Sequence, residues 1–177
     1  FGDRPLRERM RLTSANSVNI GRMVAPEGVP RVQPFFDALD RINALAEASP
    51  GFVWRLIDED GQDATALRPT IDPLLLINMS VWKDAEALFH FVYRSDHTPV
   101  MARRRDYFER FDGVFQALWW IPADTKPTIS DGISRIWHLE RFGPTPHAFT
   151  FKSKFAAPGL NAAAVDMNPD PWCVGNC

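Results

Sequence analysis

The sequence predicts one α+β domain, in which helices pack on a mainly antiparallel sheet, and three observations support this. The chain has 177 residues, a length that suits a single domain. Short apolar segments rich in Val, Ile, Phe and Trp alternate with longer segments whose apolar residues recur at helical spacing. Pro or Gly stands at most of the junctions between them, where turns are expected.

The expected strands are short runs of β-branched and aromatic residues. They lie at 17–24, 52–57, 74–82 and 115–121, and a short fifth strand can follow at 149–155. The expected helices lie at 32–48, from 83 to about 95, at 100–111 and at 130–141. Asp84 is placed to cap the helix that begins near Lys83, because a carboxylate accepts hydrogen bonds from free N–H groups of a first turn.

The order of these elements is strand, helix, strand, strand, helix, helix, strand, helix. The first seven match the split βαβ plan of ferredoxin-like folds, with the second helix broken in two. Such a plan predicts four antiparallel strands in one sheet with helices on one face. We expect the domain to cover residues 15–155, between a charged arm at 1–14 and a tail at 156–177 that is dispensable for folding.

Composition excludes several classes of function. The net charge of −2 gives no electrostatic case for binding nucleic acid. No apolar run approaches the roughly 20 residues that span a bilayer, and the N-terminal residues lack the apolar core of a secretory signal, so a cytoplasmic protein is the default expectation. The only cysteines, Cys173 and Cys177, are in the expected tail, where they could pair, bind a soft metal or remain free thiols. No metal-ligand, phosphate-loop or nucleophile-elbow motif occurs, so no cofactor is expected.

Several segments resemble one bacterial family in both order and spacing. They are INALAEASPGFVWRL, NMSVWKDAEALFHFVYRSDH, RRRDYFERFD, LWWIPA and RFGPTPHAFTF. Over about residues 17–151 the chain is similar to domain of unknown function 3291. That family in turn resembles the dimeric α+β barrels, which include cofactor-independent antibiotic-biosynthesis monooxygenases and haem-degrading enzymes. The resemblance implies a homodimer in which two sheets pack face to face, and it carries no assigned function.

Haem degradation does not transfer with this resemblance. The haem-degrading relatives use an Asn on the first strand and a Trp and a His on the second helix. Asn19 matches the Asn, but Phe91 and Val92 stand near the Trp position. His97 comes several residues before the expected His, so two of three positions differ.

The strand at 74–82 carries the main candidate site. Alternation puts Leu76, Asn78, Ser80 and Trp82 on one face, and the wholly apolar set Leu75, Ile77, Met79 and Val81 on the other. We expect the apolar set to face the helices and the polar set to face the barrel interior. Asn78 could orient oxygen or substrate, or it could be a structural amide bonded to backbone.

The helix that follows this strand supplies the acid–base candidates. His97 titrates near neutral pH and stands at a helix break, so it is a candidate catalytic residue; the alternative is a helix-end residue that binds backbone. Tyr93 could donate a proton, and Arg94 could hold a carboxylate or enolate. The whole length of this helix separates His97 from the strand, so His97 can reach only the far rim of a pocket that contains Asn78, or the pocket of a partner subunit.

Aromatic and polar residues elsewhere are expected to line the same pocket. The predicted substrate-binding residues are Trp82, Trp54, Arg55, Asn19, Ser80, Arg94 and Trp120. Core or dimer-interface packing is the alternative for the tryptophans. Trp119 and Trp120 point to opposite faces, so only one of them can look into the pocket.

Two functions are consistent with these residues. The first is a cofactor-independent oxygenase, or an isomerase or cyclase, acting on an aromatic or polyketide-like small molecule, with Asn78 and His97 stabilising or generating an enolate. The second is a non-catalytic small-molecule binder of the same fold. Haem binding through His97 is a weaker third. The expected partners are a small molecule and a second copy of the chain, without nucleic acid or membrane.

Overall fold

The sheet has the ferredoxin-like arrangement that the element order predicts. A computed structural model describes residues 13–57, 72–95, 99 and 102–158. The strands are β1 (Thr13–Arg22), β2 (Phe52–Arg55), β3 (Leu75–Trp82) and β4 (Gln116–Pro122), antiparallel in the order β2-β3-β1-β4. The helices are α2 (Gln33–Ala48), α3 (Ala85–Arg94), α5 (Arg104–Tyr107) and α6 (Ile129–Phe142). Among them, none combines the length and apolar character needed to cross a bilayer.

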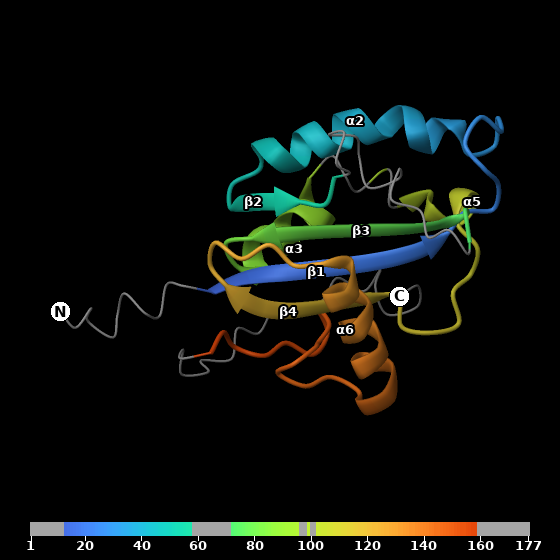
Figure 1. Cartoon of the computed structure of the whole chain (residues 1–177). Helices are drawn as coiled ribbons and strands as arrows, with labels where there is room; N and C mark the ends of the chain where they lie inside the picture. The colour runs from blue at the N-terminus through green and yellow to red at the C-terminus, as the bar shows by residue number, and fades with distance from the viewer. Residues whose placement is uncertain (1–12, 58–71, 96–98, 100–101, 159–177) are drawn as a thin grey trace, which may run out of the picture.

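Each face of the sheet is covered by its own helix. We call the two faces the α3 face and the α6 face, and Figure 1 shows α3 behind the sheet and α6 in front of it. The register of the strands assigns their residues. The α3 face carries Ala15, Ser17, Asn19, Gly21, Leu76, Asn78, Ser80, Trp82, Gln116, Leu118 and Trp120. The α6 face carries Asn16, Val18, Ile20, Leu75, Ile77, Met79, Val81, Ala117, Trp119 and Ile121.

The α6 face holds the larger apolar core. Ile77, Met79 and Val81 are buried there with Ile136 and Leu139 of α6. A Cβ at Gly132 of α6 would lie 3.0 Å from Cγ2 of Val18, so the missing side chain lets helix and sheet approach closely. The prediction of burial is therefore confirmed for these three strand residues, whereas Leu75 is only partly buried.

The predicted placement of the helices is wrong in one respect. Residues of α2 and α3, including Ala46, Leu88 and Phe89, pack around Trp82, on the face that was expected to be the barrel interior. Among the described helices, α6 is the one that covers the apolar set of β3. Alternation in a strand separates two faces, but it does not say which helix covers which face.

The element boundaries also differ from the sequence prediction at a few places. β1 begins at Thr13, four residues before the predicted strand. Within the helix predicted at 100–111, the structure describes the short helix α5, which ends at Tyr107. The predicted last strand is a single bridge between Phe149 and Leu118 rather than a regular element. The Asp84 cap is confirmed, since its Oδ1 accepts a hydrogen bond from the Ala87 N–H at 2.8 Å.

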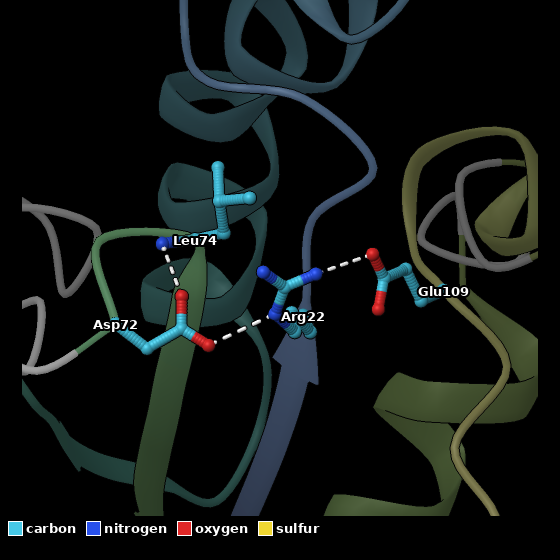
Figure 2. Close-up of polar contacts among 4 residues, drawn as sticks. All are labelled: Arg22, Asp72, Leu74 and Glu109. Carbon is cyan, nitrogen blue, oxygen red and sulfur yellow. Dashed lines mark hydrogen bonds and ion pairs between the residues drawn. The ribbon is translucent and has the colours of Figure 1, made fainter.

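An ion-pair cluster fastens the end of β1 to two other segments (Figure 2). Arg22 Nε donates to Asp72 Oδ2 at 2.9 Å, and its Nη1 is paired with Glu109 beyond α5. The other oxygen of Asp72, Oδ1, accepts from the Leu74 N–H at 3.0 Å. These contacts lower the pKa of Asp72, the Leu74 N–H most and Arg22 next. The groups are partly exposed, so these ion pairs add little stability.

Candidate functional site

A row of three amides crosses the middle of the α3 face. Asn19 of β1 lies opposite Asn78 of β3 on one side and Gln116 of β4 on the other. Ser17 and Ser80 face each other in the adjacent row. We call these five residues the amide band. Asn78 is exposed, Asn19 and Gln116 are partly buried, and Ser17 is buried.

Apolar clusters bound the amide band at both ends. Beyond the serines, Ala15 separates Trp82 from Trp120 in the next row. Beyond the amides, Gly21 is so close to Phe108 that a Cβ would lie 2.7 Å from its Cδ1, and Leu76 is buried beside Tyr107. The amide band therefore lies between two apolar clusters on the same face of the sheet.

The band offers hydrogen bonds without formal charge. Each amide provides two N–H donors and a carbonyl acceptor, a set that suits carbonyl and hydroxyl groups of a ligand. The nearest charged residue in the strand register is Arg55, opposite Ser80. Its Nε donates to Glu47 of α2 at 2.7 Å, so this guanidinium already has a carboxylate partner.

The predicted tryptophans are mainly structural in their contacts. Trp82 is fully buried, donates from Nε1 to Ser80 Oγ at 2.9 Å and stacks on Phe91 with ring centroids 5.0 Å apart. Trp54 packs with the core of the α6 face, opposite to Asn78. Trp82 thus borders the amide band and is hydrogen-bonded to its Ser80, whereas Trp54 lies on the opposite face of the sheet.

Trp119 and Trp120 lie on opposite faces of the sheet. Trp119 is buried in the core of the α6 face. Trp120 shares the α3 face with the amide band and is partly buried. Its Nε1 donates to the Phe155 carbonyl at 2.8 Å, so only the ring is available for contact with a ligand.

The predicted acid–base residues are not brought together in the described structure. Tyr93 of α3 packs between Phe89 and Phe151, at centroid distances of 4.8 and 5.4 Å. Arg94 is exposed at the last residue of the same helix. His97 lies outside the described residues. Of the two predicted catalytic residues that the structure describes, Asn78 is in the amide band and Tyr93 is not.

A family model matches residues 15–165, described as a domain of unknown function, DUF3291. The chain belongs to this family. None of the curated proteins compared matches it.

Solved structures of similar fold include three of low sequence identity. A conserved protein from Methanosarcina mazei Go1 is 13% identical, with a TM-score of 0.45, and the match covers 67% of this chain and 99% of that one. SnoaB, a cofactor-independent oxygenase from Streptomyces nogalater, is 16% identical over 66% of this chain and 96% of its own, with a TM-score of 0.41. A candidate antibiotic biosynthesis monooxygenase from Chloroflexus aurantiacus J-10-fl is 14% identical over 66% and 98%, with a TM-score of 0.40.

Sequence reasoning missed Ser17 and Gln116. Neither residue is unusual in type, and each joins the band only because β1 pairs with both β3 and β4. Alternation along β1 already puts Ser17 on the face of Asn19, and this was the signal available. The position of Gln116 depends on the register of two strands about one hundred residues apart, which one sequence does not reveal.

Proposed function

We propose that the amide band binds an aromatic or polyketide-like small molecule through its carbonyl and hydroxyl groups. The observation that carries this proposal is the alignment of Asn19, Asn78 and Gln116 across three strands, between two apolar clusters. Three strands span roughly 10 Å, which is the length of two or three fused rings. A planar ligand of that size would contact all three amides and pack against the apolar ends.

The proposal includes a chemical role for the amides. Paired N–H donors stabilise an oxyanion where it develops, so Asn78 and Asn19 would favour the enolate form of a bound phenolic ketone. A substrate with an acidic C–H can ionise with little assistance, and its enolate is the species that reacts with oxygen or rearranges. This supports a cofactor-independent oxygenase, or an isomerase or cyclase, as the reaction class.

A non-catalytic binder is the second candidate, and a specific observation favours it. All five residues of the amide band are neutral, and Arg55 beside it is paired with Glu47. Within the described residues, the band therefore offers no general base. A protein that stores or carries its ligand needs only this neutral hydrogen-bonding surface.

A binding experiment with a defined probe tests the proposal. We expect 1,8-dihydroxyanthrone to quench the tryptophan fluorescence of the full chain saturably. The variants Asn78→Ala and Asn19→Ala should each weaken binding at least tenfold, because each loses hydrogen bonds to the probe. Ser134→Ala changes an exposed hydroxyl on α6, across the sheet, and should bind as the wild type does. Equal affinity in all four proteins would refute binding at the band.

Oxygen consumption separates the two candidates. An oxygenase should consume oxygen when the probe is added, at a rate that falls in Asn78→Ala, whereas a binder should bind the probe and leave both probe and oxygen unchanged. An isomerase or cyclase should alter the probe or an open-chain analogue without using oxygen. A small molecule that co-purifies with the protein would name the natural ligand class directly.

We also propose that the protein forms a homodimer. The face expected to pack against a second sheet, that of Trp82, is partly covered by α2 and α3, and the opposite face is covered by α6, so another surface has to make the contact. Large apolar side chains that remain exposed include Trp137 and Phe142 on α6, and Val53 and Ile57 at the β2 edge. Burial of such residues is a common driving force for self-association. A stable monomer in sedimentation velocity at micromolar concentration would contradict the proposal.

A further inference from the structure

A basic cluster stands at the C-terminal half of α6, across the sheet from the amide band. It consists of Arg135 and His138 on the helix and of His147 in the turn that follows, held together by Thr145. Arg135 Nη1 contacts both the Nδ1 atom and the carbonyl oxygen of His147, each at 2.6 Å. His138 Nε2 is 2.8 Å from Thr145 Oγ1, which also accepts from the His147 N–H at 3.2 Å.

These contacts use only one edge of the Arg135 guanidinium. Its carbon lies 5.5 Å from the ring centroid of Trp119, so the plane is supported by the core of the α6 face. No acceptor among the described residues is within hydrogen-bonding distance of its Nε or Nη2. A pair of N–H groups on one edge of a guanidinium is the geometry that binds two oxygens of one oxyanion.

The positive character of the cluster is not neutralised by a neighbouring acid. The two imidazole rings lie 4.6 Å apart, and in the described part of the chain no carboxylate forms an ion pair with Arg135, His138 or His147. Asp131, one turn before Arg135, is the acid that acts on it electrostatically. That carboxylate already accepts from the N–H and the hydroxyl of Thr128 in the helix cap.

The cluster is accessible from solvent. The side chain of His147 is exposed, and Arg135 and His138 are partly buried. Partial burial strengthens a charge-assisted hydrogen bond, because competing water is limited on one side. An incoming oxyanion can thus reach the guanidinium without displacing the core beneath it.

We propose that Arg135, His138 and His147 form a binding site for a small oxyanion, a phosphate or carboxylate group. The Nε and Nη2 edge of Arg135 holds two of its oxygens. Because a guanidinium only donates, His147 accepts from it through Nδ1, and its Nε2–H is left as a donor for the oxyanion, with the ring of His138 beside it.

Histidine NMR signals of the full chain test this site. At pH 6, titration with inorganic phosphate should shift two of the four histidine resonances saturably, those of His138 and His147, and leave His90 on α3 unchanged. Sodium chloride at equal ionic strength should not reproduce the shifts. An acetate series and a phosphate series distinguish the two sources of oxyanion, and the tighter of the two identifies the ligand class.

Two variants separate the site from general charge effects. Arg135→Lys keeps the charge but loses the planar pair of donors, and should weaken phosphate binding at least fivefold. Arg141→Gln removes an exposed charge from the same helix and should change it less than twofold. If Arg135→Lys fails to fold, His147→Ala serves instead and should weaken phosphate binding, because the ring N–H donor is lost. Absence of a saturable shift, or equal weakening in Arg141→Gln, would overturn the proposal.

Discussion

The two faces of the sheet are built from the same strands but differ in what their middle contains. On the α6 face, apolar side chains continue from one end of β3 to the other and are covered by α6. On the α3 face, apolar clusters occupy both ends, and the amide band lies between them. A face devoted to stability would continue its apolar row, so the interruption is what supports the proposed ligand site on the α3 face.

The polar residues of the two faces make the same contrast. Asn78 on the α3 face is exposed, where water or a ligand can satisfy its amide. Asn16 on the α6 face is fully buried between Val81 and Trp119, and neither its Oδ1 nor its Nδ2 has a hydrogen-bond partner in the described structure. The amide of Asn78 is available for binding. The burial of Asn16 costs desolvation free energy that no hydrogen bond offsets.

The largest expected effect is on the apolar end of the α3 face. Replacing Trp82 with Ala should lower the free energy of unfolding by about 3–5 kcal/mol, because a fully buried ring and its stacking on Phe91 are lost. Urea denaturation measures this change. Lys83→Ala, one residue later, is the control, since this side chain is exposed and its loss should change stability by roughly 0.5 kcal/mol or less. Similar losses in both variants would contradict a core role for Trp82.

Adjacent residues of β3 sharpen the comparison between the faces. Ile77→Ala should cost about 2–5 kcal/mol through lost burial and a cavity beneath α6. Asn78→Ala, one residue later and on the other face, should change the free energy of unfolding by roughly 0.5 kcal/mol or less, because its side chain is exposed. A large loss for Asn78→Ala would make it a structural amide and would weaken the proposed binding role.

A smaller effect of opposite sign is expected at Asn16. Leu has nearly the same branched shape without the polar atoms, so Asn16→Leu should raise the free energy of unfolding by about 1–3 kcal/mol through relief of an unsatisfied buried amide. The slightly larger methyl groups oppose part of this gain. A decrease in stability would mean that ordered water holds the amide in the folded protein.

The sequence was sufficient for the sheet and insufficient for the site. Alternation of apolar and polar residues in β3 correctly separated Ile77 from Asn78, because each side chain's direction is a local property of the strand. The contacts of Trp82 and Arg55 could not be predicted, since one depends on the indole reaching Ser80 and the other on Glu47 of a neighbouring helix. Long-range register and side-chain pairing are tertiary properties, and periodicity carries no information on them.

The same limit explains the basic cluster. His138 and His147 match no catalytic or metal-ligand motif in the sequence, so the sequence did not single them out. The turn after α6, bridged between Thr145 and Ala148, brings His147 back onto Arg135 and against the ring of His138. A local sequence window could not have shown this, because the three side chains meet only in the folded turn.

The smallest expected effect is a pH dependence confined to the α6 face. Burial, then the charge of Arg135, and then His138 lower the pKa of His147 below its usual 6.5, so the folded protein favours the neutral ring. As the pH falls below about 6.5, the unfolded chain takes up this proton before the folded chain does, and stability decreases. The contribution of neutral His147 is complete above that pH and is lost as the pH falls through its lowered pKa.

A variant isolates this contribution from those of other groups. Urea denaturation of the wild type between pH 7.5 and 5 should show a decline that is shallower in His147→Gln, which cannot take up the proton. The carboxylates of Asp72 and Asp131 have pKa values lowered from 3.8, so their contributions are lost only at more acidic pH and leave this window undisturbed. Because His147 is largely open to solvent, the difference should be small. Parallel curves for the two proteins would show that the stability of this turn does not depend on a neutral His147. The packing of the α6 face would then be as independent of pH as the neutral amide band on the other face of the sheet.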